Sequence, residues 1–409
     1  MNQQIHNNTP ENENDNNHQT IMIDDLNNQN NSIENVIQIM SVEELYRVNV
    51  PKKYINLFNK QTFDPSKNII LIDTSYMIFH KFFALRSWYY RAFPDKNIPN
   101  DYDWLEDDIF MNKYRKLFFE NVVFLCKKKN VNISNIVFAI DCKHSSIWRN
   151  REQTTYKETR KESHQKSNFY SYKIFGIVID EILPIICDKY GCIVLKHNEC
   201  EADDVVANCV LNLTQNSNNN NEIEFNLEID DLANSYNGRF IYIVATDTDY
   251  IQICSQNVIL IDMKCRELND RYLNNFTNNI NYLMGKILYG DLSDNIPNCF
   301  ISKDFLNEKG FQNYSRQPYI KCTKNLVYKI MSNIGIYTHF CNVIEEIRKN
   351  KELLYQNQNT DNVNGNKNIM CSVVRDEQFT KNLIMIDFKM LPDALKLSLD
   401  EKIKKQLKL

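Results

Sequence analysis

The sequence lacks the features of membrane, secreted and zinc-finger proteins. It contains no run of about 18 apolar residues, so we expect no membrane span. Its N-terminus has neither a basic segment nor an apolar stretch, so we expect no secretory signal. None of the 12 cysteines forms a C-x-x-C pair, and Cys126, Cys187 and Cys254 lie in apolar runs. We therefore expect buried thiols in a reducing, intracellular compartment, with no disulfide framework or zinc site.

Neither sign of charge dominates the chain. The formal net charge is -4, so any affinity for nucleic acid must come from a local basic patch. The length of 409 residues suggests two domains or three small ones, and a hydrophobic content of 43% is normal for a globular core. The sequence does not distinguish nucleus, cytoplasm or a viral factory, because it has no clear nuclear-localisation cluster.

Asparagine-rich segments interrupt the chain. Residues 1–66 form an extension whose first 40 residues combine asparagine with Gln, Glu and Asp. Such a composition cannot bury enough apolar surface to offset ordering, so we expect this extension to be largely disordered. Similar inserts occur at 215–222 and 356–368, and we interpret them as surface elaborations.

Short apolar runs alternate with helix-like segments between these inserts. The runs expected to be buried strands are 68–72, 136–140, 193–195, 240–245 and 258–261. Helical patterns are found at 76–85, 108–128, 169–190 and 203–213. This alternation favours an α/β domain over 67–270, with a mostly parallel central sheet and helices on both faces. From about residue 271 the strand signal fades, so we expect 271–409 to form a smaller helical domain.

Carboxylates follow each of the first four predicted strands, and another pair lies in the motif GDLSDN. These nine acids are Asp73, Asp141, Glu201, Asp203, Asp204, Asp247, Asp249, Asp291 and Asp294. Parallel strands bring their carboxyl ends to one edge of the sheet, so we expect the acids to converge there. Their mutual repulsion requires compensation, and oxygen-only ligands favour Mg²⁺ or Mn²⁺ over Zn²⁺. Two such ions are the arrangement that cleaves phosphodiesters.

Each acidic motif also has a simpler interpretation. A single aspartate after a strand is often the N-cap of the next helix. An Asp-x-Asp is often a turn, and an acidic cluster at a helix start is favoured by the helix dipole. The order of the motifs, each after a strand, favours the metal site.

A basic stretch at 143–173 stands out from the acidic chain. It contains eight Lys or Arg and three Glu, interleaved with Trp148, Tyr156, Tyr170 and Tyr172. Basic side chains hold phosphates and aromatic rings stack on unpaired bases, so we expect this segment to lead a single strand to the acids. The simpler interpretation is an ordinary solvated loop of mixed charge.

The motifs in this order resemble those of the flap endonuclease and 5′→3′ exonuclease superfamily, especially the phage-type enzymes and the 5′-nuclease domain of bacterial DNA polymerase I. The quoted matches are LIDTSYMIFHKFFAL (71–85), FAID (138–141), YKETR (156–160), ECEADDVVA (199–207), VATDTDYIQI (244–253) and GDLSDNIP (290–297). The resemblance implies a PIN-like nuclease domain with a basic arch at about 143–173. A divergent helix-hairpin-helix-like DNA-binding region is implied within 271–409.

The resemblance also assigns roles to individual residues. It implies that Asp73, Asp141, Glu201, Asp203 and Asp204 ligate a catalytic metal ion. Asp247, Asp249, Asp291 and Asp294 match the ligands of a second, more open site. Lys157 and Arg160 match a basic pair that steers the scissile phosphate, so the expected catalytic residues are Lys157, Arg160, Asp73 and Asp204. Arg149, Arg151, Tyr156 and Lys161 are expected to join Lys157 and Arg160 in binding nucleic acid.

The chain departs from the family after GDLSDN. A glycine-rich hairpin of the G-x-G type is expected there, but the segment carries an insertion and no G-x-G, and the whole chain has only 8 glycines. Whether this region grips duplex DNA or binds K⁺ is therefore open.

These observations lead to a Mg²⁺-dependent 5′ nuclease with two or more ions, for which Mn²⁺ can substitute. The expected substrates are DNA with 5′ flaps, nicks or ends, and RNA primers annealed to DNA, in replication, repair or recombination. A 5′→3′ exoribonuclease or PIN-type ribonuclease is the nearest alternative, and a non-catalytic DNA-structure-binding protein is a more distant one. We expect a monomer without membrane attachment, and no sliding-clamp peptide is evident at the C-terminus. The exonuclease-to-endonuclease balance, the DNA or RNA preference, the pathway and the oligomeric state are not written in the sequence.

Overall fold

A computed structural model describes residues 51–99, 101–158, 171–215, 238–273, 279–299 and 376–409. Of these described residues, 79–99 and 101–118 form one unit, and 51–78 together with those from 119 onward form the other. Within the described residues, no helix combines the length and apolar character needed to cross a membrane.

The larger unit is built on a five-stranded parallel sheet. Its strands are β1 (Ile69–Asp73), β2 (Ile136–Ile140), β3 (Ile193–Lys196), β4 (Ile241–Val244) and β5 (Val258–Ile261). Their order is β3-β2-β1-β4-β5, and every neighbouring pair is parallel. All five strands predicted from apolar runs are confirmed. β2 and β3 lie on one side of β1, and β4 and β5 lie on the other. The strand order therefore reverses between β1 and β4, and such a switch point is where parallel sheets hold their functional groups.

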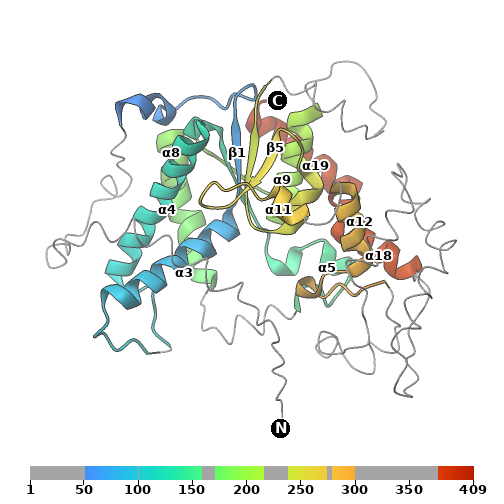
Figure 1. Ribbon diagram of the computed structural model, residues 1–409, viewed down its shortest axis with the longest axis horizontal. Helices are drawn as coiled ribbons and strands as arrows, with labels where there is room; N and C mark the ends of the chain where they lie inside the picture. Colours follow the sequence, from blue (N-terminus) through green and yellow to red (C-terminus); the bar gives the residue numbers. More distant parts are fainter. Residues whose placement is uncertain (1–50, 100, 159–170, 216–237, 274–278, 300–375) are drawn as a thin grey trace, which may run out of the picture. The chain divides into compact units, whose positions relative to one another are not determined.

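Both faces of the sheet are covered. Leu71, Val137 and Ile243 belong to one buried cluster together with α9 (Ala202–Gln215) and α19 (Asp393–Leu407). Ile70 and Phe138 alternate with them along the strands, point to the opposite face and are also completely buried. Figure 1 shows α8 (Leu183–Tyr190) and α9 on opposite sides of the sheet, as the predicted architecture requires.

The helices of the larger unit follow the predicted segments, with one local difference. The predicted helix at 169–190 is divided, over its described residues, into α7 (Ser171–Gly176), a π-helix η5 (Ile177–Ile182) and α8. Pro184 lies at the start of α8 and has no N–H to donate to the preceding turn, which explains the wider helical turn there. Short elements complete this part: η2 (Lys52–Phe58), η3 (Ile133–Asn135), η4 (His144–Ser146), α5 (Arg149–Glu152), η6 (Thr248–Ile253) and α11 (Asn269–Leu273).

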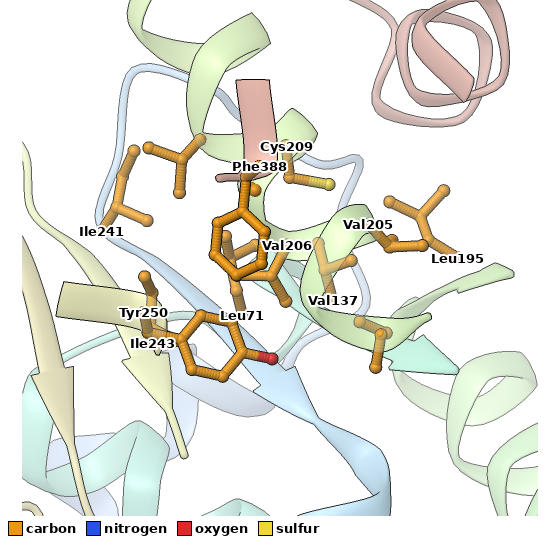
Figure 2. Packing of buried hydrophobic residues seen from close by; sticks show 14 of the residues in the cluster. Leu71, Val137, Leu195, Val205, Val206, Cys209, Ile241, Ile243, Tyr250 and Phe388 are labelled. Carbon is orange, nitrogen blue, oxygen red and sulfur yellow. The ribbon is translucent and has the colours of Figure 1, made fainter. Parts of the chain in front are cut away.

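The C-terminal segment packs on the sheet domain. The described part of 271–409 contains α12 (Asn279–Tyr289), η7 (Leu292–Asp294), α18 (Asp376–Ile386), η8 (Phe388–Met390) and α19. Leu399, Ile403 and Leu407 of α19 are fully buried in the same cluster as α9, and Phe388 lies beside Tyr250 in that cluster (Figure 2). Residues 376–409 therefore pack on the sheet of the larger unit, and the division into domains 67–270 and 271–409 stays a prediction. The hairpin-like region predicted after GDLSDN falls largely in 300–375, outside the described residues.

The smaller unit has its own aromatic core. It contains the greater part of α3 (Thr74–Ala92) and the first half of α4 (Asp108–Lys129). Tyr89, Trp104 and Phe110 pack with ring centroids 5.0–6.1 Å apart. Asp107 accepts hydrogen bonds from Tyr89, Tyr102 and Lys96, which fixes the loop between the two helices.

Candidate metal centre

Asp73 and Asp141 stand at the carboxyl ends of the two adjacent strands β1 and β2. Asp73 caps α3, because its Oδ1 accepts the Tyr76 N–H at 3.0 Å, and its Oδ2 accepts the Tyr250 hydroxyl at 3.1 Å. Asp141 accepts the Ala202 N–H at 2.8 Å and the hydroxyl of Ser75. Burial, with the neighbouring charge of Asp141, raises the pKa of Asp73 to about 7. Burial likewise raises the pKa of Asp141.

A group of three acids lies at the N-terminus of α9. Carboxylate oxygens of Glu201, Asp203 and Asp204 lie within 4.8 Å of one another. The local sequence explains this arrangement, because the Asp204 side chain accepts the Glu201 N–H at 3.1 Å in the manner of a capping box. The first turn of a helix also favours negative charge through its dipole. Burial, together with the charges of Asp204 and Glu201, outweighs the opposing effect of Arg149 and raises the pKa of Asp203 well above its ordinary value.

Arg149 is the buried counter-charge of this group. Its guanidinium donates to Asp204 at 2.8 and 3.0 Å and to Glu201 at 2.9 Å, and it lies 3.8 Å from Asp203. Only 2% of its side chain is exposed. Burial disfavours its charge, but Asp204 and the other acids outweigh this and raise the pKa of Arg149 well above its ordinary value.

Tyr156 and Lys157 connect the α9 acids to Asp294. The Tyr156 hydroxyl lies 3.0 Å from Glu201 and 3.3 Å from Asp294. Lys157 Nζ donates to Glu201 at 2.6 Å and lies 3.6 Å from Asp294. Burial alone would raise the pKa of Glu201, but Lys157 and Arg149 outweigh it and lower that pKa to about 2. Lys157 adopts φ +55°, a left-handed conformation unusual for a lysine and found where structure or function requires it.

Two acids of the second set, Asp249 and Asp291, meet at Lys286 of α12. Lys286 Nζ donates to Asp249 and lies 3.1 Å from Asp291. The Ser293 hydroxyl lies 2.6 Å from Asp291 and 3.5 Å from Asp294, which brings the GDLSDN pair together. Burial opposes ionisation of Asp291, but Lys286 and Ser293 outweigh it and lower its pKa.

A tight turn holds Asp291 in place. Asp291 and Ile296 exchange backbone hydrogen bonds of 2.9 and 2.7 Å, and Gly290 before them has φ +72°. A Cβ atom at residue 290 would lie 2.3 Å from the carbonyl oxygen of Ile296. Only glycine fits there, which explains the first letter of the motif.

The acid sets share one region of the larger unit. Charges of Asp73, Asp203, Asp247 and Asp141 all act on the buried Tyr250 hydroxyl and, after burial itself, raise its pKa. Asp247 is exposed and accepts the Asp249 N–H at 3.0 Å, so these two acids are joined by a local turn. The structure thus gathers acids that follow β1, β2, β3 and β4.

The donor set fits divalent cations. All the acidic ligands offer oxygen, the choice of Mg²⁺ and Mn²⁺. Burial raises the pKa of Asp73, Asp141 and Asp203 and so disfavours their ionised form in the metal-free protein, and a cation bound between them would favour that form. Their roles as ligands remain predictions.

The residues predicted to bind nucleic acid lie in different positions. Arg149 and Tyr156 are buried and contact carboxylates of the α9 acids. Their binding to nucleic acid stays a prediction. Arg151 is exposed and pairs with Glu199. Lys157 reaches the acids. Arg160 and Lys161 lie outside the described residues.

Four side chains of the site were not assigned to it from sequence. Ser75, Tyr250 and Trp148 donate hydrogen bonds to Asp141, Asp73 and Asp204 respectively. Lys286 pairs with Asp249 and Asp291. For Tyr250 and Trp148 the residue type itself was a signal, because a buried tyrosine or tryptophan needs a hydrogen-bond partner for its polar group. Lys286 gave no such signal, since one lysine in an amphipathic helix is ordinarily solvated.

Comparisons with known proteins agree with the motifs. A family model described as the N-terminal resolvase-like domain of 5′-3′ exonucleases matches residues 68–278, about half of the chain. A search of curated protein sequences gave no match. A structure of bacteriophage T5 flap endonuclease, in a pseudo-enzyme–product complex with DNA and metal ions, shares 14% identity and a TM-score of 0.47, covering 84% of this chain and 100% of that one. Bacteriophage T5 5′-exonuclease with bound zinc shares 14% identity and a TM-score of 0.43, covering 83% of this chain and 100% of that one.

Proposed function

The chain belongs to the 5′-3′ exonuclease family, and from this premise we propose that it is a divalent-metal-dependent nuclease that hydrolyses phosphodiester bonds at the 5′ ends or flaps of DNA. The observation that carries the proposal is the convergence of acids from four strand ends around the buried Tyr250 hydroxyl, among them Asp73, Asp141 and Asp203, whose ionisation burial disfavours in the metal-free protein. We propose Mg²⁺ as the natural ion and Mn²⁺ as a substitute.

The acids divide into two candidate ligand sets. Asp73, Asp141 and Asp203, with Glu201 and Asp204, would hold one ion, and Asp247, Asp249, Asp291 and Asp294 would hold a second. When bound, such ions supply Lewis acidity and charge neutralisation toward a phosphodiester. The protein's part is to hold these oxygens in place before substrate arrives, which the caps of α3 and α9 and the 290–296 turn accomplish.

Among the cations that the structure describes, we propose Lys157 as the one that meets the substrate phosphate. Its ammonium lies between Glu201 and Asp294, which belong to the two proposed ligand sets. A phosphate entering between these sets would be met by this ammonium, which stabilises charge developing on the phosphoryl oxygens. Lys157→Met should therefore reduce cleavage by about 10²-fold or more, the usual effect of removing one such donor.

The test uses a labelled double-flap DNA and a single-stranded RNA of the same length. We expect cleavage near the DNA flap junction with Mg²⁺ or Mn²⁺, a product bearing a 5′-phosphate, and no cleavage in EDTA. Cleavage of the RNA alone would identify a ribonuclease instead. Flap binding without cleavage under any ion would identify a DNA-structure-binding protein.

The best inactive control is Asp73→Asn. An asparagine at this position keeps an oxygen for the Tyr76 N–H, so the cap of α3 survives while the charge is lost. Asp204→Ala is a poorer choice, because it strips hydrogen bonds from Arg149, Trp148 and the Glu201 backbone. We expect Asp73→Asn to bind the flap and fail to cut it, and wild-type cleavage by this variant would refute the site.

A further inference from the structure

Two side chains, Arg149 and Gln252, meet at the C-terminal end of α18, and each is connected to a different group of acids. Arg149 Nε donates to the carbonyl oxygen of Met385 at 2.9 Å. One residue further along, the Gln252 amide donates to the carbonyl of Ile386 and accepts the Phe388 N–H, both at 3.0 Å. The last carbonyl groups of a helix have no hydrogen-bond donor within the helix. Here Arg149 and Gln252 donate to the carbonyls of Met385 and Ile386.

Arg149 connects this helix end to the α9 acids. All three of its nitrogens are committed, because NH1 and NH2 hold Glu201 and Asp204 while Nε holds Met385. The guanidinium is planar and rigid, so fixing Nε fixes the direction of the other two groups. Its side chain is 2% exposed and has no open surface on which to meet a substrate.

Gln252 connects the same helix end to the acids that follow β4. It lies on η6, three residues after Asp249, and the intervening Tyr250 both donates to Asp73 and packs against Phe388 with ring centroids 6.2 Å apart. The two anchors of Gln252 and the Tyr250–Phe388 contact therefore hold η6 against residues 385–388. Movement of this helix end would shift η6 and Arg149 together.

We propose that residues 385–388, where α18 ends and η8 begins, form a positioning element that sets the two acid groups relative to each other through Arg149 and Gln252. This segment lies beyond residues 68–278, so the metal centre is completed by a part of the chain outside the matched family domain. The inference rests on the proposed function, because the acids it positions are the proposed metal ligands. Residues that orient metal ligands typically change affinity or activity 10- to 100-fold when they are replaced.

The test compares Gln252→Leu, Arg149→Lys and the double variant. Gln252→Leu keeps the approximate volume of the side chain and removes both hydrogen bonds to 386–388. Arg149→Lys keeps the charge and loses the planar fork. Mn²⁺ affinity is measured by calorimetry in the absence of DNA, and kcat and KM are measured on the flap substrate. Asp400→Ala is the matched control, since it removes an α19–α9 hydrogen bond of 2.7 Å to Asn212 that belongs to neither acid group.

We expect each single variant to weaken Mn²⁺ binding at least 10-fold and to lower kcat while flap KM stays within twofold. The control should lose thermal stability without losing Mn²⁺ affinity. Because both side chains act through one helix end, the double variant should lose less Mn²⁺ affinity than the product of the single losses.

Three results would overturn the inference: wild-type Mn²⁺ affinity in Gln252→Leu, equal losses in the control, or independent effects in the double variant. If Gln252→Leu does not fold, Gln252→Glu, which keeps the acceptor for the Phe388 N–H, takes its place under the same criteria. A wild-type protein that binds no Mn²⁺ and cuts no DNA would instead refute the proposed function, so the two failures are distinguishable.

Discussion

Replacing Asp73 with asparagine should make the metal-free protein more stable while removing its activity. Burial and the repulsion from Asp141 raise the pKa of Asp73 from 3.8 to about 7. One pKa unit corresponds to about 1.4 kcal/mol, so the ionised carboxylate costs the metal-free fold up to roughly 4 kcal/mol above pH 7. An amide removes this cost but makes weaker hydrogen bonds to Tyr76 and Tyr250, and we expect a net gain of about 2 kcal/mol.

The pH dependence gives the sign of the effect. A carboxyl whose pKa is higher in the folded state stabilises the fold below its unfolded pKa and loses that contribution as the pH rises through the folded value. In EDTA the wild type should therefore lose stability between about pH 4 and pH 7, and Asp73→Asn should lose less. The difference between the two proteins should grow across that window and stay constant above it.

Thermal unfolding in EDTA at pH 5 and pH 8 measures this, with Asp188→Asn as a matched control at an exposed carboxylate. At roughly 2–4 °C per kcal/mol for a domain of this size, the gain at pH 8 is about 4–8 °C. Adding Mg²⁺ should stabilise the wild type and the control by mass action and stabilise Asp73→Asn much less. A lower melting temperature for Asp73→Asn than for wild type at pH 8 in EDTA would refute the reasoning.

Three further substitutions test other parts of the site. Gly290→Ala places a Cβ 2.3 Å from the Ile296 carbonyl oxygen at a φ of +72°. It should lower the free energy of unfolding in urea by roughly 2–3 kcal/mol and weaken Mn²⁺ binding. Unchanged values for both would show that the turn tolerates a side chain. Lys286→Met leaves Asp249 and Asp291 without their shared ammonium. The melting temperature of this variant in EDTA should therefore be lower than that of the wild type, and Mg²⁺ should raise it by more. An equal rise in both proteins would deny that Lys286 offsets the repulsion between the two acids. Phe388→Ala removes a ring that is 4% exposed and should cost about 3–5 kcal/mol in chemical denaturation, whereas a cost below about 1 kcal/mol would place 388 outside the core.

The sheet and the gathering of acids were predictable because both follow from local rules. Continuous apolar runs such as 136–140 mark doubly buried strands, and parallel strands bring their carboxyl ends together whatever lies between them. Asp73 and Asp247 are far apart in sequence, yet the order β2-β1-β4 makes their strands neighbours. The prediction needed no knowledge of the connecting segments, which is why the asparagine-rich inserts did not disturb it.

The counter-charges were not predictable, because charge pattern alone does not tell a buried cation from a solvated one. Arg149 is one of eight basic residues in the segment 143–173, and its near neighbour Arg151 in that segment is exposed. What distinguishes Arg149 is a set of partners at Glu201, Asp204 and Met385, the last of them 236 residues away. No local periodicity carries information at that separation. The same limit explains why the packing of 376–409 on α9 was not predicted.

The placement of Arg149 and Lys157 follows from the electrostatics of a site that must hold several carboxylates before any ion arrives. Unpaired buried carboxylates would protonate, and protonated acids are poor ligands for hard cations. Arg149 and Lys157 keep Glu201 ionised, with a pKa of about 2, whereas Asp73 and Asp203 have raised pKa values. The site thus combines acids that Arg149 and Lys157 keep ionised with acids whose ionisation a bound cation, on the proposed function, would favour. On the proposed function, protein cations that neutralised every acid would leave little charge to attract a metal ion. Without any such cation the buried acids would be protonated, so a partial set of fixed cations suits the proposed metal centre.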